Sequence, residues 1–148
     1  MNILAVNDDK AMTELIAMLL QKHGFVVRAS HSARDAIKAI SENWAQAVVL
    51  DLMMPDMDGR QICKKVREFS NVPIIILSAF NDPDIVAESL DSGADDYLVK
   101  PVPSEVLAAH LTRLIRRTGR LILNRDRLAP STWIPASASI PTTPAKSG

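Results

Sequence analysis

Residues 47–59 read AVVLDLMMPDMDG, an apolar run that ends on the carboxylate of Asp51. Residues 47–50 are all apolar, which is typical of a strand buried on both faces of a parallel sheet. The Pro, Asp and Gly residues that follow are typical of a loop. The pattern therefore predicts a central strand with a charged residue at its carboxyl end, and that charge needs an explanation.

Through the first 118 residues, similar apolar runs alternate with segments in which apolar residues recur with the period of an α-helix. The expected strands are residues 3–6, 25–29, 47–50, 74–77 and 97–99. The expected helices are residues 10–23, a segment capped by Ser32, a segment carrying Ile62, Val66 and Phe69, residues 83–92, and a segment capped by Ser104 with Leu107, Leu111, Leu114 and Ile115 on its buried face. This alternation predicts an α/β fold built on a parallel sheet.

The bulk composition fits one globular domain with a sizeable core, since 47% of the 148 residues are hydrophobic. The charges of seventeen basic and seventeen acidic residues cancel, so the net charge gives no indication of nucleic-acid binding. The apolar runs are too short to cross a membrane, and we expect a cytoplasmic protein without a membrane partner. The lone Cys63 excludes an internal disulfide and fits a reducing compartment.

The composition changes beyond residue 118. Residues 119–148 are rich in Pro, Ser, Thr and Ala, and we expect a linker or a disordered tail there and no complete output domain. Within this region, residues 121–130 read LILNRDRLAP and keep some apolar spacing, which could be a strand of an incomplete domain.

Polar side chains follow four of the five expected strands. Asn7, Asp8 and Asp9 follow the first, Asp51 ends the third, and Ser78 and Lys100 follow the fourth and fifth. In an open parallel sheet, ligands bind beyond the carboxyl ends of the strands. The simpler explanation is that loops are polar and that acidic residues cap helices, which we expect for Asp9. That explanation does not account for the whole set.

Asp8 and Asp51 face each other if the first and third strands are neighbours. Two carboxylates ~4 Å apart repel by about 4 kcal/mol at an effective dielectric constant of 20. A hard divalent cation offsets this repulsion, and Mg²⁺ suits a site with few carboxylates because it keeps several waters and accepts a phosphate oxygen. With the positive charge of Lys100 added, the sheet edge is predicted to accept a phosphoryl group.

In order and spacing, these motifs resemble the CheY-like receiver domain of two-component response regulators over residues 1–118. The matching motifs are the acidic cluster after ILAV, then LDLMMPDMDG, IILSA and GADDYLVKP. The resemblance implies a flavodoxin-like, doubly wound sheet of five parallel strands in the order 2-1-3-4-5, surrounded by five helices. It places the first strand beside the third.

The resemblance also implies roles for individual residues. Asp51 would be the phosphoacceptor, Lys100 would pair with the phosphoryl oxygens, and Mg²⁺ would be held by Asp8, Asp51 and the backbone carbonyl of Met53. The phosphoryl donor would be a phosphohistidine of a sensor histidine kinase or a histidine phosphotransfer protein. Such a domain is a signalling phosphoprotein that catalyses only its own phosphorylation and dephosphorylation.

Two further residues are implied to form a switch. Ser78 would hydrogen-bond the new phosphoryl group, and Tyr97 would turn into the space that its loop vacates. The surface formed by the fourth helix, fifth strand and fifth helix would then change shape and control an output, with transcription and homodimer formation through this surface both left open. DNA would be a partner only through an output domain that is absent from this chain.

Three departures from the family pattern affect details of the site. Asn7 stands where the family usually carries an acid that reaches the metal through water, so weaker Mg²⁺ binding is expected. Met53 and Phe80 are bulky where the family admits attacking water, so a slowly decaying phosphoryl group is expected. Val106 and His110 stand near positions that carry Glu and Arg for dimer salt bridges in the winged-helix subfamily.

Other readings stay open at this stage. A pseudo-receiver that acts as a protein-interaction module without phosphorylation would follow if Asn7 disables the metal site, although Asp8, Asp51, Ser78 and Lys100 are all retained. A flavodoxin-like flavin protein needs a phosphate-binding loop of backbone donors after its first strand, where this chain has acidic residues. The output is also open: a truncated chain, a damaged gene product and a stand-alone receiver that acts by docking are all consistent with the sequence.

Overall fold

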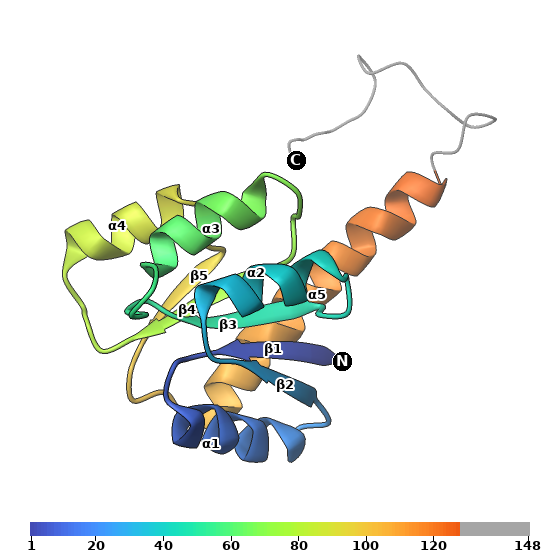
Figure 1. Ribbon diagram of the computed structural model, residues 1–148. Helices are drawn as coiled ribbons and strands as arrows, with labels where there is room; N and C mark the ends of the chain where they lie inside the picture. The colour runs from blue at the N-terminus through green and yellow to red at the C-terminus, as the bar shows by residue number, and fades with distance from the viewer. Residues whose placement is uncertain (128–148) are drawn as a thin grey trace. The chain divides into compact units, whose positions relative to one another are not determined.

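Five parallel strands form the central sheet in the order β2-β1-β3-β4-β5, in a computed structural model that describes residues 1–127 (Figure 1). The strands are β1 (Asn2–Val6), β2 (Val26–Ser30), β3 (Ala47–Asp51), β4 (Ile74–Ser78) and β5 (Asp96–Val99). The α/β class predicted from the alternating pattern and the strand order implied by the family resemblance are both confirmed. The strand order reverses between β1 and β3, and this is the place where such sheets bind ligands.

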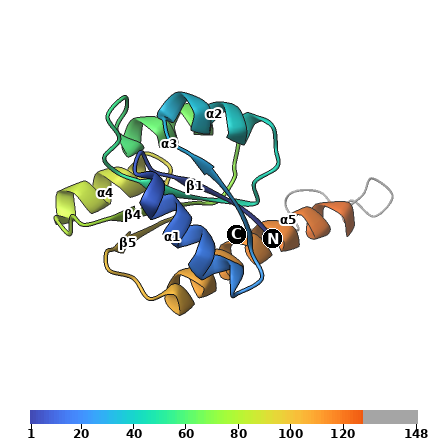
Figure 2. The same ribbon diagram turned by 60° about the horizontal axis from the view of Figure 1, so that its bottom comes forward.

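Five helices cover the two faces of the sheet. They are α1 (Lys10–Gln21), α2 (Ala33–Ser41), α3 (Gly59–Arg67), α4 (Pro83–Asp91) and α5 (Ser104–Arg127). Helices α2, α3 and α4 lie on one face, and α1 lies on the other with the first part of α5 (Figures 1 and 2). Residues Met1–Ile115 form one compact unit, which contains the whole sheet edge where the predicted site residues lie.

The core is divided by the sheet into two apolar layers. One layer joins alternate strand residues, such as Val48 and Ile76, to buried side chains of α2 and α3. The other joins the remaining alternate residues, such as Val49 and Ile75, to α1 and to Leu107, Leu111 and Leu114 of α5. Because β3 and β4 are buried on both faces, their continuous apolar runs have a direct structural reason.

Side-chain caps fix where several helices begin, and therefore where the loops at the site end. The Asp9 carboxylate accepts hydrogen bonds from the backbone N–H groups of Ala11 and Met12, and the Ser32 hydroxyl accepts one from Asp35. Both caps were predicted from the sequence. Ser104, in contrast, is the first residue of α5, and the Pro103 carbonyl accepts the bond from the backbone N–H of Leu107.

The last helix is longer than the sequence indicated. It continues through Gly119 to Arg127, so residues 121–127 are helical and do not form the suggested strand. Leu and Arg, which are good helix formers, supply four of these seven residues, whereas a single Gly costs only about 1 kcal/mol in a helix. Phe69 lies beyond the end of α3 and is exposed. Residues 128–148, where most of the predicted tail falls, lie outside the described residues.

Among the helices within residues 1–127, none combines the length and the apolar character that crossing a membrane requires.

Candidate functional site

Asp51 and Lys100 meet at the carboxyl edge of the sheet. Asp51 is the last residue of β3, and Lys100 follows β5 directly. The Lys100 Nζ lies 3.8 Å from the Asp51 Oδ1, with 17% of the Asp51 side chain and 27% of the Lys100 side chain exposed. This distance exceeds the roughly 2.8 Å of a direct charge-assisted hydrogen bond, so the pair attracts without being locked together. The ammonium group can therefore reach new oxygens attached to Asp51.

The end of β1 brings Asn7 and Asp8 to the same place. Val6, the last residue of β1, pairs with Leu50 in the parallel ladder, so Asn7 follows β1 beside the end of β3, where Asp51 lies. Asn7 is only 6% exposed, and its Oδ1 accepts a hydrogen bond of 2.9 Å from the backbone N–H of Asp9. The Asn7 amide thus braces the turn into α1, while Asp8 is exposed.

The pKa of the Asp51 carboxyl is raised above its ordinary value. Burial is the largest cause, the positive charge of Lys100 opposes it, and the negative charge of Asp8 adds to it. Backbone N–H groups of Met53 and Leu52 also lower this pKa, by smaller amounts. The net effect shows that the unliganded site disfavours the charged form of Asp51, and a cation beside both carboxylates would remove that penalty.

The loop after Asp51 is held closed at its two ends. Met53 and Asp58 form an antiparallel bridge, and the Gly59 N–H donates to the Leu52 carbonyl at 2.7 Å. A Cβ atom at Gly59 would lie 3.0 Å from both the Asp51 carbonyl oxygen and the Leu52 Cα, so a larger residue would require these backbone atoms to shift where α3 begins beside β3.

Asp51 and Asp8 are the two carboxylates whose charges interact at this edge. No group of three or more acidic, His or Cys side chains that could hold a metal occurs among the described residues. A cation here would keep several waters or phosphoryl oxygens as ligands. That coordination suits Mg²⁺, which binds through one or two carboxylates, better than ions that need a complete protein cage.

Ser78 and Tyr97 converge on the backbone of Phe80. The Ser78 side chain, 2% exposed, accepts a hydrogen bond of 3.1 Å from the Phe80 N–H. The Tyr97 hydroxyl donates a bond of 2.7 Å to the Phe80 carbonyl. The bond to Ser78 uses a lone pair of its hydroxyl oxygen, so the hydroxyl hydrogen can be donated to a phosphoryl oxygen. Phe80 was predicted to matter for its bulk, and its backbone role was missed.

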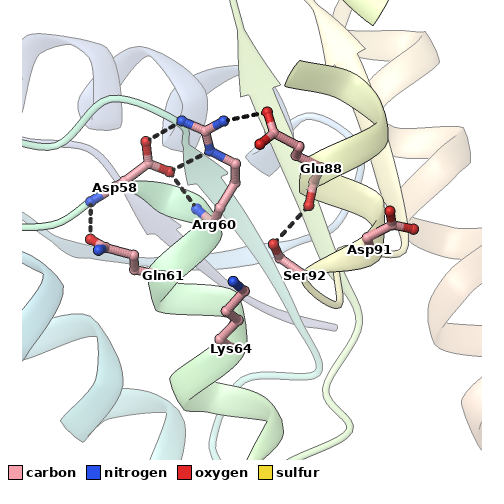
Figure 3. Close-up of a pocket in the computed structure, with 7 residues that line it drawn as sticks. All are labelled: Asp58, Arg60, Gln61, Lys64, Glu88, Asp91 and Ser92. Atoms are coloured by element: carbon pink, nitrogen blue, oxygen red, sulfur yellow. Dashed lines mark hydrogen bonds and ion pairs between the residues drawn. The ribbon is translucent and has the colours of Figure 1, made fainter. Parts of the chain in front are cut away.

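An ionic cluster beside the loop was also missed by the sequence prediction. Arg60, at the start of α3, forms ion pairs with Asp58, the residue just before α3, and with Glu88 of α4. The three residues line a polar groove of about 500 Å³ (Figure 3). The hydrogen bond from Arg60 is the main reason that the pKa of Asp58 lies below its usual range. The Asp58–Gln61 spacing was a readable capping-box signal, and both bonds of that box are present. No local signal pointed to Glu88.

Comparisons with known proteins agree with this geometry. The family model described as response regulator receiver domain matches residues 3–112. The transcriptional regulatory protein AfsQ1 of Streptomyces coelicolor is 38% identical over 119 residues, which cover 80% of this chain and 53% of that protein. The response regulator MprA of Mycobacterium avium is 39% identical over 119 residues, 80% of this chain and 52% of its own. The chain spans about half the length of the curated relatives it matches.

A solved structure gives the same result for the fold. The crystal structure of a response regulator receiver domain protein from Clostridium thermocellum superposes with a TM-score of 0.77 at 27% identity, over 81% of this chain and 98% of that one. Its match covers the five-stranded sheet and the elements that position Asp51.

Proposed function

This chain belongs to the family of response regulator receiver domains, and we propose that it accepts a phosphoryl group on Asp51 from a phosphohistidine of a partner protein. An Asp51 carboxylate oxygen would form the new bond to phosphorus while the bond from phosphorus to the imidazole nitrogen breaks. The electron pair of that bond stays with the imidazole, and the product on this chain is an acyl phosphate. Relatives named as response regulators support a histidine kinase or a phosphotransfer protein as the donor.

The observation that carries the proposal is the position of Asp51 between Lys100 and Asp8. Phosphoryl transfer requires in-line positioning and positive charge where the phosphoryl oxygens gather. The end of β3 fixes the carboxylate, and Lys100, 3.8 Å away, is close enough to move onto the oxygens of the transferred group. Partial burial keeps competing water away from the carboxylate.

The residues at this edge fit Mg²⁺, which receiver domains generally use. Asp8, Asp51 and the Met53 carbonyl oxygen would hold the ion, with Asn7 reaching it through water. Bound there, the ion would neutralise charge on the carboxylates and on the phosphoryl oxygens. Asn7 supplies no charge, so the proposal includes a higher Mg²⁺ requirement than a site with a second acid at this position would show.

The proposed switch runs from Ser78 to the surface of α4, β5 and α5. If Ser78 donates to a phosphoryl oxygen, its loop moves, and the Phe80 carbonyl that holds the Tyr97 hydroxyl moves with it. Each element of this surface carries an exposed large apolar side chain: Leu90 at 43%, Val99 at 40% and Val106 at 41%.

We propose a second copy of the chain as the occupant of this surface. In one chain, Asp96 already pairs with His110 and Arg113, so its charge is satisfied without a partner's arginine. The dimer contacts would therefore be mainly apolar. Because AfsQ1 is described as a transcriptional regulatory protein, we propose transcription as the output that this surface controls.

A pseudo-receiver that binds partners without being phosphorylated is the competing function. The buried Asn7 amide, where an acid would be expected, is the observation that favours it. The two functions differ in a rate measurement with a small-molecule phosphodonor such as acetyl phosphate. We expect phosphorylation of the full chain that stops when Mg²⁺ is removed by EDTA and slows strongly in Lys100→Ala. Phosphorylation that is absent at every Mg²⁺ concentration would favour the pseudo-receiver.

A further inference from the structure

Helix α4 is held against the sheet by little apolar burial. Its one fully buried residue is Ser89, whose hydroxyl donates back to the Ile85 carbonyl of the same helix. Helix α3, of the same length, buries Gly59, Ile62, Cys63 and Val66. Segments with few buried apolar contacts open at low free-energy cost, so other contacts of α4 must account for a larger share of its attachment.

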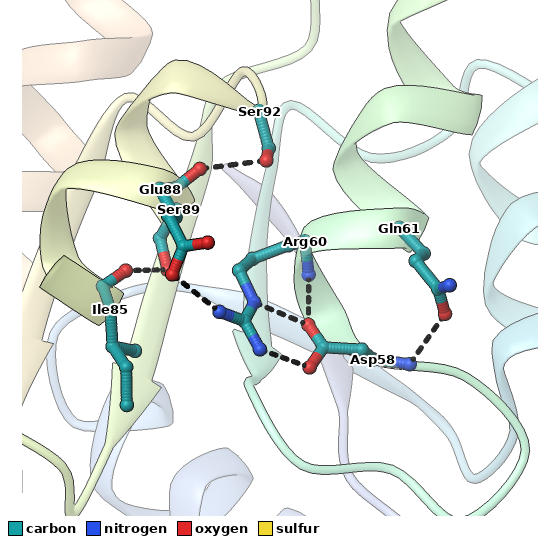
Figure 4. A network of polar contacts seen from close by, with 7 residues as sticks. All are labelled: Asp58, Arg60, Gln61, Ile85, Glu88, Ser89 and Ser92. Atoms are coloured by element: carbon teal, nitrogen blue, oxygen red, sulfur yellow. Dashed lines mark hydrogen bonds and ion pairs between the residues drawn. The ribbon is translucent and has the colours of Figure 1, made fainter.

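The Arg60 guanidinium supplies such a contact. Its Nη1 lies 3.0 Å from the Glu88 Oε1 on α4, while its Nε and Nη2 donate to the two Asp58 carboxylate oxygens at 3.0 and 2.7 Å (Figure 4). The two hydrogen bonds to Asp58 hold the guanidinium in one orientation, which reduces the entropy lost when it also binds Glu88. We call the contacts of Asp58, Arg60 and Glu88 the α3–α4 strap.

The strap is joined directly to the phosphoacceptor loop. Asp58 pairs in the antiparallel bridge with Met53, which lies two residues after Asp51. The next residue, Gly59, donates to the Leu52 carbonyl at 2.7 Å, and a Cβ atom there would lie only 3.0 Å from the Asp51 carbonyl oxygen. A shift of the Met53 carbonyl or of the Asp51 backbone would therefore move the anchored end of Arg60.

We propose that the α3–α4 strap holds α4 in its unphosphorylated position and couples that position to the loop of Asp51, with Arg60 as the positioning residue. The inference rests on the proposed phosphorylation of Asp51. A ligand of the site that displaces α4 must part Arg60 from Glu88, and this lowers its apparent affinity. Loss of the strap therefore loosens α4 and tightens binding of a phosphoryl mimic, whereas simple structural damage would weaken binding.

The first test measures amide hydrogen exchange in the unphosphorylated full-length chain. Arg60→Gln and Glu88→Gln should each raise the exchange rates of α4 about threefold, in line with an exposed pair, and the double variant should exceed neither single variant. Lys64→Gln is the matched control, since it removes one positive charge from the same helix and the same groove. Rates in α4 that are unchanged, or equally raised in the control, overturn the proposal.

The second test measures the affinity for beryllofluoride in the presence of Mg²⁺ by calorimetry. Arg60→Gln and Glu88→Gln should bind about threefold more tightly than wild type, with Lys64→Gln unchanged. Equal affinity in all four proteins would overturn the strap and leave the phosphoacceptor intact. Failure of the wild type to bind the mimic at all would overturn the proposed function itself, together with the coupling.

Discussion

Substitution of Asn7 by aspartate adds a second acid beside Asp51. Val6 at the end of β1 pairs with Leu50, and neighbouring strands lie ~4.8 Å apart along the hydrogen-bonding direction, so residue 7 lies at about this spacing from the end of β3. Two charges at about 5 Å repel by about 3 kcal/mol at an effective dielectric constant of 20, and by under about 1 kcal/mol in bulk water. Residue 7 is 6% exposed, so the higher figure applies more closely. Without Mg²⁺, we expect Asn7→Asp to lose about 2 kcal/mol of stability.

Addition of Mg²⁺ should narrow the stability difference between the two proteins. The carboxylate that repels Asp51 in the metal-free state attracts the ion, and a gain of about 1.4 kcal/mol corresponds to tenfold tighter binding. A ligand that binds only the folded state stabilises it by RT ln(1 + [L]/Kd), so the stability of Asn7→Asp should rise at lower Mg²⁺ than that of wild type.

Thermal unfolding across a Mg²⁺ titration measures both effects. A loss of about 2 kcal/mol corresponds to a Tm roughly 5 to 10 °C below wild type without the ion. Asn71→Asp is the matched control, because it adds the same charge at an exposed loop position. If Asn7→Asp and wild type respond to Mg²⁺ at the same concentrations, Asn7 does not limit the metal site and this reasoning is wrong.

Four further substitutions test separate parts of the account. Because burial raises the pKa of Asp51, its negative charge costs stability at neutral pH, and Asp51→Asn should raise the Tm at pH 7. The gain should vanish as the pH falls below the ordinary pKa of 3.8, because the carboxyl group of the wild type is then protonated in both the folded and the unfolded chain. Phe80→Ala and Met53→Ala should shorten the lifetime of the phosphorylated chain severalfold by admitting water, as measured by the decay of the phosphoryl adduct. Arg67→Ala removes bonds to three backbone carbonyls and an ion pair, and should cost about 2 to 4 kcal/mol in urea unfolding.

Each of these predictions has its own contradicting result. An Asp51→Asn protein less stable than wild type at pH 7 would mean that the carboxylate has a stabilising partner in the folded state. A wild-type adduct that decays within seconds, or that decays no more slowly than in the alanine variants, would remove Met53 and Phe80 from the water route. For Arg67, a loss equal to that of the exposed control Arg34→Ala would show that its carbonyl contacts contribute little.

The parts of the fold that could be predicted are those encoded by neighbouring residues. Continuous apolar runs such as residues 74–77 are typical of strands buried on both faces, and caps such as Asp9 and Ser32 act within three residues of their own position. The gathering of Asp51 and Lys100 at one edge followed from the parallel sheet, because all its strands end on the same side. The strand order came from the family resemblance and not from the residues alone.

The parts that could not be predicted depend on contacts between distant segments. Arg60 and Glu88 are 28 residues apart, and the Tyr97 hydroxyl meets a backbone carbonyl 17 residues away. Exposed charged and aromatic residues have many positions available to them, and their partners are set only once the helices have packed. The extension of α5 was missed for a different reason, since residues 119–148 were assigned to a linker or tail from their composition, although Leu and Arg, which favour a helix, supply four of residues 121–127.

The central claim is that Asp51 accepts a phosphoryl group, and intact-mass measurement tests it most directly. The full chain is incubated with a small-molecule phosphodonor and Mg²⁺, beside Asp51→Asn, and both are weighed by mass spectrometry. We expect one added phosphoryl group on the wild type and none on the variant. A wild type without added mass, or an adduct that persists in Asp51→Asn, would contradict the assignment of Asp51 as the phosphoacceptor.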